Sequence, residues 1–258
     1  MTVKTKKKKP APASYQDRSY RRLAELGNLT PFEVRVKETD LQIMADCNLA
    51  GAATDLVIQF RSQLEGYIAG HPAFLTSLTP LPDDKLAPPI VKAMLAAGRA
   101  AGVGPMAAVA GAIAEFVGKA LCPKQTREII VENGGDIYLD RRQDSTIAIF
   151  AGTSPLSNKV GIKIPLSAMP LGICTSSGTV GHSLSLGEAD SVTVLARDTA
   201  LADSVATRLG NEVIAGRDIN QALAVGQTIP EISGLVIIRD DQLGAWGEVE
   251  LVPIPNNH

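Results

Sequence analysis

The sequence predicts an α+β fold in which a largely antiparallel sheet packs against helices. Short segments with the alternating pattern of β-strands follow one another directly, and such direct succession favours antiparallel pairing. Helical segments with one apolar face precede and follow these strands. The chain of 258 residues can bury a substantial core. We expect a basic flexible tail over 1–17 and a single domain over 18–258.

Composition and charge limit the classes of partner. The chain is 45% hydrophobic and 20% charged, which is typical of a globular protein, and its net charge is −2. Five lysines within 4–9 are the basic exception, and we interpret them as a solvated tail. The uncharged run 100–114, rich in Gly and Ala, is too short for a membrane span. We therefore expect no nucleic-acid partner and no membrane partner.

The cysteines indicate a reducing compartment. The chain has three, Cys47, Cys122 and Cys174, and their wide separation gives neither metal-ligand spacing nor an even disulfide set. We expect Cys47 and Cys122 to be small buried core residues. A cytoplasmic location fits this cysteine usage best.

The first elements are a hairpin and two helices. Segments 33–37 and 39–45 alternate between apolar and polar residues and are close enough to pair. Apolar residues at helical spacing predict a helix with one buried face over 52–69. A further helix is expected over 89–101, after a loop punctuated by prolines.

A helix rich in small residues comes next. Gly102-Val103-Gly104 interrupts the preceding helix, and Pro105 occupies the favoured first position of a new one that extends to Leu121. The run Gly111-Ala112-Ile113-Ala114 leaves one face of it nearly bare. Close packing against the sheet would explain that face, and so would the approach of a cofactor or another backbone.

The second half is predicted to be strands, then helices, then a hairpin. The expected strands are 128–132, 137–139, 146–150, 160–164, 172–175 and 190–196. Two helices should follow, over 199–213 and 219–224. A terminal hairpin is expected to pair 234–239 with 248–252.

Asn133-Gly134-Gly135-Asp136 is the first candidate for a functional site. It separates two apolar strand segments, and its Asn-Gly and Gly-Gly pairs favour backbone with φ above zero. A tight turn would explain the glycines. Asp136 is common in turns as well, so the choice between a plain turn and a ligand-binding turn stays open at this point.

A second candidate is a turn of small hydroxyl and glycine residues at the end of a strand. It consists of Thr175, Ser176, Ser177, Gly178 and Thr179. Free amides and hydroxyls in such a turn can hold an anion, although a Ser/Thr-stabilised loop is the commoner case. His182 follows closely, and a lone histidine is more often structural than catalytic. The chain lacks the Gly-rich and nucleophile-elbow motifs of nicotinamide enzymes, P-loop proteins and α/β-hydrolases.

The third candidate is on the helix that follows Asp198, a suitable N-cap residue. Asp203 and Thr207 are four residues apart, so they lie beside each other on the flank of the buried stripe. A carboxylate and a hydroxyl in this arrangement can bind a hard cation such as Mg²⁺, with water or phosphate oxygens completing its shell. The alternative is a solvated Asp–Thr pair.

The order of these motifs resembles that of the ApbE superfamily, whose flavin transferases move FMN from FAD to a Thr or Ser of a target protein. The matching residues, in order, are Gly111-Ala112-Ile113-Ala114, Asn133-Gly134-Gly135-Asp136, Thr175-Ser176-Ser177-Gly178, His182, Ser191-Val192-Thr193-Val194 and Ala202-Asp203-Ser204-Val205-Ala206-Thr207. The resemblance is strongest to a small uncharacterised ApbE-like family and extends over nearly the whole chain after the tail. It implies an ApbE-like fold.

The same resemblance implies a Mg²⁺ site formed by Asp203, Thr207 and a backbone carbonyl near Ala112. The bound cation would neutralise the pyrophosphate of FAD. This chain departs from the transferase pattern in two places. Glu115-Phe116 replaces Lys-Gly, and the segment between the Ser/Thr turn and the strand at Ser191 is short, with no Asp-Pro after His182.

Two functional hypotheses follow. The first is a Mg²⁺-dependent protein that acts on or binds a flavin or another phosphate-bearing ligand, with Asp136 or His182 handling a proton. The second is a non-flavin accessory or binding protein in the cytoplasmic sulfur or homocysteine metabolism of anaerobes, which the resemblance implies. A small phosphate-bearing ligand is the expected partner, and a homo-oligomer is left open.

Overall fold

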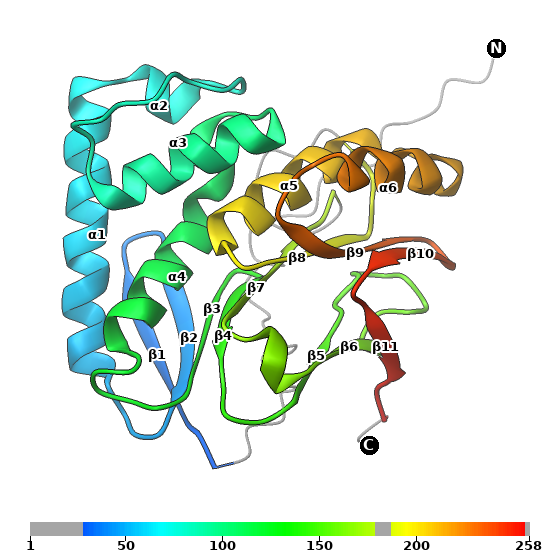
Figure 1. The fold of residues 1–258 in the computed structure, drawn as a ribbon, viewed down its shortest axis with the longest axis horizontal. Coiled ribbons are helices and arrows are strands. Elements are labelled where there is room, and N and C mark those ends of the chain that lie inside the picture. The colour runs from blue at the N-terminus through cyan, green and yellow to red at the C-terminus, as the bar shows by residue number, and fades with distance from the viewer. Residues whose placement is uncertain (1–27, 179–186, 256–258) are drawn as a thin grey trace.

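A large antiparallel sheet with helices on one face forms the body of the molecule (Figure 1). The computed structural model describes residues 28–178 and 187–255. Eight strands lie in the order β1-β2-β3-β4-β7-β8-β9-β10, and every neighbouring pair is antiparallel. The predicted α+β class is therefore confirmed. The expected tail over 1–17 lies outside the described residues.

The strands of this sheet are short. Their bounds are Thr30–Val36 (β1), Thr39–Ala45 (β2), Ile129–Asn133 (β3), Asp136–Asp140 (β4), Leu171–Ser176 (β7), Ser191–Ala196 (β8), Ile232–Arg239 (β9) and Gln242–Gly247 (β10). A second, three-stranded sheet has the order β11-β6-β5. It consists of Glu250–Pro253 (β11), Val160–Ile164 (β6) and Ser145–Ala148 (β5).

The helices cover the face of the large sheet that is away from the small one (Figure 1). Their bounds are Ala50–Gly70 (α1), Ala73–Thr76 (α2), Pro89–Ala101 (α3), Val109–Leu121 (α4), Thr199–Glu212 (α5) and Ile219–Gln227 (α6). Single 3₁₀ turns occur at Pro105–Ala108 (η3), Leu166–Ala168 (η4) and Gly216–Asp218 (η5). The predicted helices and the break before Pro105 are thus confirmed.

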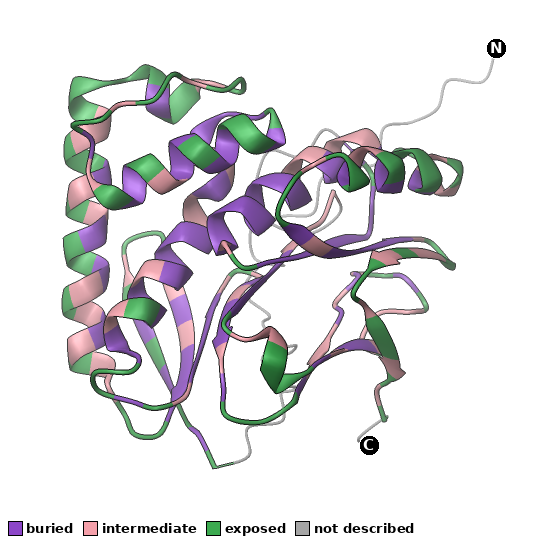
Figure 2. Ribbon diagram, viewed as in Figure 1, coloured by how far each residue is buried: buried purple, intermediate pink, exposed green. Residues whose placement is uncertain are grey.

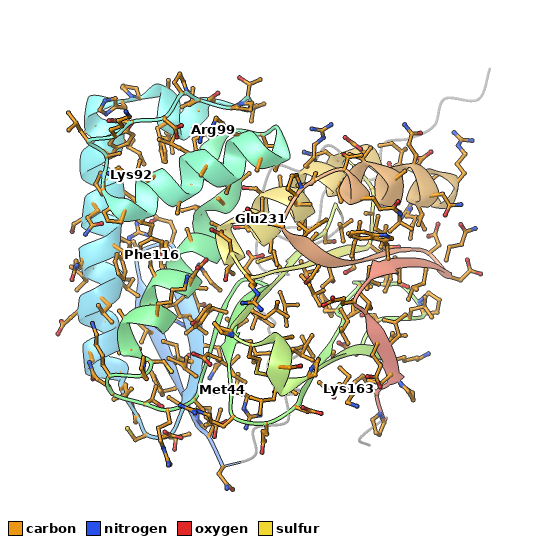
Figure 3. All side chains as sticks on the ribbon, in the orientation of Figure 1. Met44, Lys92, Arg99, Phe116, Lys163 and Glu231 are labelled. Carbon is orange, nitrogen blue, oxygen red and sulfur yellow. The ribbon has the colours of Figure 1, made fainter. Side chains whose placement is uncertain are left out.

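Two apolar cores lie on the two faces of the large sheet (Figure 2). The larger core packs α1, α3, α4, α5 and α6 against one face, and the smaller one fills the space toward β5 and β6. Phe116 of α4 belongs to the rim of the larger core, and its ring meets that of Phe60 edge to face at 5.4 Å (Figure 3). The sheet therefore gains apolar burial on both faces, which is its main source of stability.

The predicted pairing of 234–239 with 248–252 is wrong. β9 pairs with β10, whereas β11 pairs with β6 of the small sheet. The sequence signal of β10 is weak because glycines interrupt it. Gly244 is required there, since a Cβ atom at this position would lie 2.5 Å from Cγ2 of Ile219 in the neighbouring helix α6.

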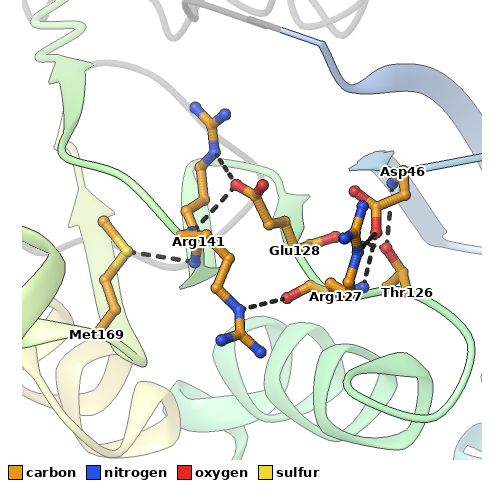
Figure 4. A network of polar contacts seen from close by, with 7 residues as sticks. Asp46, Thr126, Arg127, Glu128, Arg141 and Met169 are labelled. Carbon is orange, nitrogen blue, oxygen red and sulfur yellow. Dashed lines mark hydrogen bonds and ion pairs between the residues drawn. The ribbon is translucent and has the colours of Figure 1, made fainter.

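A polar network ties together the ends of β2, β3 and β4 that lie away from the β3–β4 turn (Figure 4). The Asp46 carboxylate accepts a hydrogen bond from the Arg127 backbone N–H at 2.8 Å. Glu128 forms a 3.3 Å ion pair with Arg141, whose side chain is only 4% exposed. Hydrogen bonds and ion pairs therefore stabilise this end of the sheet. The candidate site lies at the opposite end.

The prediction that Cys47 and Cys122 are buried is wrong for the first and confirmed for the second. Cys122 is buried, as expected, but Cys47 is exposed. Cys47 falls in the bend between the end of β2 and the start of α1, where the chain crosses the surface.

No single helix among the described residues combines the length and apolar character needed to cross a membrane. The segments Pro89–Ala101 and Pro105–Leu121 pass that test only as a pair, with a 107° bend between them.

Candidate functional site

The Asn133–Asp136 motif is a two-residue hairpin turn between β3 and β4. Asn133 and Asp136 are register partners, and both glycines have positive φ, +70° at Gly134 and +108° at Gly135. The Gly135 N–H donates to Oε1 of Glu132 at 2.8 Å. The predicted tight turn is confirmed, and its conformation explains both glycines.

The hairpin turn contacts the start of α4. Nδ2 of Asn133 donates to the Ala110 carbonyl at 3.0 Å. From the other side, Oδ2 of Asp203 accepts a hydrogen bond from the Gly111 N–H at 2.9 Å, and the Ala110 N–H also bonds this carboxylate. The first turn of α4 is thus the point at which the hairpin and helix α5 meet.

Close helix packing accounts for the small residue at Gly111. A Cβ atom there would lie 2.5 Å from the Thr199 carbonyl oxygen and 2.9 Å from Cβ of Asp203. Farther along α4, a Cβ at Gly118 would lie 2.2 Å from the ring of Tyr138 in β4. The face of small residues predicted from the sequence therefore packs against α5 near the start of α4 and against the sheet near its end.

Asp203 is buried rather than solvated. Asp203 is 8% exposed. Burial raises the pKa of its carboxyl to about 7, although the hydrogen bonds from the N–H groups of Gly111 and Ala110 act to lower that pKa. Thr207, one turn later, is half-buried, and Ala112 is fully buried within α4. One alternative from the sequence was that Asp203 and Thr207 form a solvated pair. The burial of Asp203 excludes it for that residue.

Asp136 is a second buried carboxylate in the same region. It is 7% exposed, and its Oδ1 atom has no hydrogen-bond partner among the described residues. Burial raises the pKa of Asp136 well above its usual range, and repulsion from Asp203 and Glu132 raises it further. The site therefore places two carboxyl groups together where water is excluded.

Cys174 lies directly opposite Asp136 in the β4–β7 pair. Its thiol donates to the Thr199 carbonyl at 3.3 Å. Burial raises the pKa of this thiol well above its usual range, and the charges of Asp136 and Asp203 add to the effect. Cys174 is thus a neutral residue of the site wall.

The Ser/Thr turn lies at the end of β7, one strand away from the hairpin turn. Oγ1 of Thr175 hydrogen bonds to Oγ1 of Thr193 at 2.9 Å. A Cβ atom at Gly210 of α5 would lie 3.3 Å from Oγ of Ser176, so this turn faces the C-terminal half of α5. Thr179 and His182, both predicted site residues, lie outside the described residues.

Two amides of the predicted anion nest already have acceptors within the protein, and one of them is the Thr175 N–H, which bonds the Asp136 carboxylate. The Gly178 N–H donates to the Ala189 carbonyl at 2.9 Å. A Cβ at Gly178 would lie 2.2 Å from the Gly187 carbonyl oxygen, so glycine is needed for this close approach of two chain segments. An anion at this turn would have to bind the hydroxyl groups and the other amides.

Glu115, the residue that replaces a lysine of the transferase pattern, has both of its carboxylate oxygens bound within the protein. Its Oε2 accepts a hydrogen bond from the Thr199 N–H at 2.7 Å, and its Oε1 is paired with Lys119. Asp198 caps the same helix, because its Oδ1 accepts from the Leu201 N–H at 2.8 Å, as predicted. Two N–H groups at the start of α5 are therefore bound by the protein's own carboxylates.

Sequence reasoning missed the roles of Glu115, Glu132 and Cys174. Glu132 could have been noticed from the sequence, because it is a charged residue in an otherwise apolar strand directly before the Asn-Gly-Gly-Asp turn. Among the residues that the structure describes, no group of three or more His, Cys, Asp or Glu side chains could hold a metal ion. A cation at Asp203 would thus need hydroxyl, carbonyl, water or ligand oxygens as well.

The architecture has a counterpart among solved structures. It is similar to the flavinyl transferase ApbE of Pseudomonas stutzeri, with a TM-score of 0.53 and 14% identity over 85% of this chain and 94% of that one. At this level of identity the likeness shows the fold alone. The predicted ApbE-like fold is confirmed.

The sequence comparisons show the family. A family model described as AbpE bacteria matches residues 21–234. A UPF0280 protein of Methanocaldococcus jannaschii is 42% identical over 225 residues, which cover 84% of this chain and 91% of that protein. A UPF0280 protein of Methanothrix thermoacetophila is 44% identical over 199 residues, covering 76% and 83%. The chain belongs to this ApbE-like family of UPF0280 proteins.

Proposed function

We propose that the chain is a Mg²⁺-dependent enzyme that acts on a flavin or another phosphate-bearing small molecule. One observation carries the proposal, namely that Asp203 and Asp136 are buried together beside the first turn of α4. Buried carboxylates are costly unless they are paired, protonated or bound to a cation. Mg²⁺ prefers such oxygen ligands and is held by one or two carboxylates together with phosphate oxygens.

The class of ligand is supported by the fold. The Pseudomonas stutzeri protein of the same fold is a flavinyl transferase. FAD carries a pyrophosphate, which can supply the oxygens that the protein side chains lack. The hydroxyl groups of Thr175, Ser176 and Ser177 lie at the end of the neighbouring strand, where they could bind the same anion.

Each residue then has a role in the proposed reaction. Asp203 and Thr207, with a backbone carbonyl near Ala112, would hold Mg²⁺, which supplies positive charge to neutralise a phosphate leaving group. The amides of α4 keep the Asp203 carboxylate in place through the Gly111 hydrogen bond. Asp136 or His182 would move a proton to or from the reacting hydroxyl.

A transfer assay tests this function. The purified chain is incubated with FAD, Mg²⁺ and a peptide that contains Ser and Thr, and the mass of the peptide is then measured by mass spectrometry. We expect a covalent FMN adduct that disappears in EDTA and in Asp203→Asn. FAD binding without an adduct would restrict the function to a flavin-binding protein. Neither binding nor transfer would overturn the proposal in favour of the non-flavin accessory protein.

A further inference from the structure

We infer that Asp136 and Asp203 are joint ligands of a single divalent cation, so that Asp136 is a metal ligand rather than a proton carrier. The inference rests on the proposed function and assigns the second carboxylate of its cation site. It is drawn from the placement of the two side chains and from one oxygen atom that the protein leaves without a partner.

Two elements that each carry one of the aspartates meet at the same turn of α4. Asp203 comes from α5, and its Oδ2 is fixed by the Gly111 N–H at 2.9 Å. Asp136 begins β4, and its register partner Asn133 reaches the Ala110 carbonyl at 3.0 Å. The hairpin and α5 are therefore anchored to consecutive residues of α4, which brings the two carboxylates into electrostatic contact.

Asp136 is incompletely satisfied by the protein. The Thr175 N–H bonds its carboxylate and the Cys174 thiol lies within hydrogen-bonding reach of it, yet Oδ1 is buried with no hydrogen-bond partner among the described residues. No lysine or arginine in the described part of the chain forms an ion pair with Asp136 or Asp203. A buried carboxylate oxygen without a donor marks the place of a missing positive group.

A shared proton is the competing explanation, because two close carboxylates can hold one proton between them. The two explanations differ for Asp136→Asn. An amide donates a hydrogen bond to Asp203 and so replaces the shared proton, whereas it removes the charge that a cation needs. Asparagine at this position should thus preserve a proton-sharing site but weaken a cation site.

Mn²⁺ binding in solution tests the inference, with Mn²⁺ as a paramagnetic substitute for Mg²⁺. Free Mn²⁺ is counted by electron paramagnetic resonance in titrations of the full-length protein, with and without inorganic pyrophosphate. We expect one Mn²⁺ per chain, bound more tightly in the presence of pyrophosphate. Asp136→Asn and Asp203→Asn should each weaken binding by at least about tenfold, since even groups outside the first coordination shell can change metal affinity by that much.

Asp198→Asn is the matched control. It makes the same chemical change at the start of the same helix, and asparagine caps a helix as well as aspartate does, so Mn²⁺ affinity should not change. Wild-type affinity in Asp136→Asn together with weakened binding in Asp203→Asn would overturn the inference but leave the proposed function standing. Absence of Mn²⁺ binding by the wild type under both conditions would overturn the proposed function itself.

A second measurement does not depend on the folding of any variant. Crystals of the wild-type protein are soaked in Mn²⁺ and pyrophosphate, and the anomalous difference density is calculated. The expected peak lies within coordination distance of a carboxylate oxygen of both Asp136 and Asp203. A peak coordinated by Asp203 and Thr207 but not by Asp136 would contradict the inference.

Discussion

The Glu115 carboxylate of α4 accepts a 2.7 Å hydrogen bond from the Thr199 N–H, the first residue of α5. In return, the Asp203 carboxylate of α5 accepts from the Gly111 N–H near the start of α4. Each helix thus supplies a buried acid that satisfies an unpaired amide at the N-terminus of the other. This exchange fixes the position of Asp203, on which the proposed site depends.

Removal of the Glu115 carboxylate should destabilise the fold. Glu115→Ala leaves the Thr199 N–H without its acceptor, and a buried amide left unpaired costs about 1–3 kcal/mol. Glu115→Gln keeps an acceptor oxygen and should cost less. The free energy of unfolding in urea measures both variants.

Lys119→Ala is the control for Glu115, because it removes only the exposed partner of the ion pair. The Lys119 side chain is 55% exposed, so its loss should change stability by less than about 1 kcal/mol. Equal losses in Glu115→Ala and Lys119→Ala would show that the helix cap contributes nothing.

A methyl group at Gly111 should force α4 and α5 apart. The added Cβ would lie 2.5 Å from the Thr199 carbonyl oxygen, a backbone atom that can move only with its helix. Overpacking of this kind costs about 1–3 kcal/mol. We expect Gly111→Ala to lower the free energy of unfolding in urea by that amount.

Gly66→Ala separates this packing effect from helix propensity. Gly66 is an exposed residue inside α1, and a Cβ there would meet nothing within 4 Å. Alanine should stabilise the protein by about 0.5–1 kcal/mol, since glycine is the poorer helix former. Stabilisation by both substitutions would mean that α4 and α5 are not in tight contact at Gly111.

The two glycines of the β3–β4 turn should respond differently to substitution. Gly135 has φ +108°, which strains any L-residue, so Gly135→Ala should cost about 1–3 kcal/mol of stability in urea unfolding. Gly134 has φ +70° and open space around it, and asparagine is favoured at this position of such turns. Gly134→Asn should be close to neutral, and a loss as large as that of Gly135→Ala would contradict the turn type.

Local features of the fold and site were predictable from the sequence. Strand alternation, the Asn-Gly-Gly-Asp turn and the Asp198 cap depend on residues close together in the chain, and the structure confirms them. The buried stripe of α5 follows from helical periodicity, and Ala202, Val205 and Leu209 are all buried. These features needed no knowledge of distant contacts.

Features that depend on distant contacts were not predictable. Helical spacing placed Asp203 on the flank of a buried stripe, but its burial depends on α4, which packs there only because Gly111 has no side chain. The partner of Glu115 is 84 residues away. The pairing of β9 with β10 rather than with a later segment was missed because packing of α6 requires a glycine in β10.

The cysteines should differ sharply in reactivity toward a thiol reagent such as DTNB. Cys47 is exposed, whereas Cys122 and Cys174 are buried. Burial, with a smaller contribution from the charge of Asp140, raises the pKa of Cys122 to about 11. Burial also raises the pKa of Cys174. A raised thiol pKa means that the reactive thiolate is populated only as the pH approaches that value, so Cys122 is almost entirely protonated at pH ~8. We expect one fast-reacting thiol per native chain and three, the full cysteine content, in denaturant.

Cys47→Ser should abolish the fast reaction in the native protein and leave two thiols in denaturant. Asp140→Asn removes the negative charge beside Cys122 and should lower the pKa of that thiol. Because burial is the larger cause, the Cys122 thiol of this variant should still react slowly at pH ~8. Fast native reaction of a second thiol in the wild type would show that Cys122 or Cys174 is accessible, and rapid modification of Cys174 in particular would mean that the wall of the candidate site opens in solution.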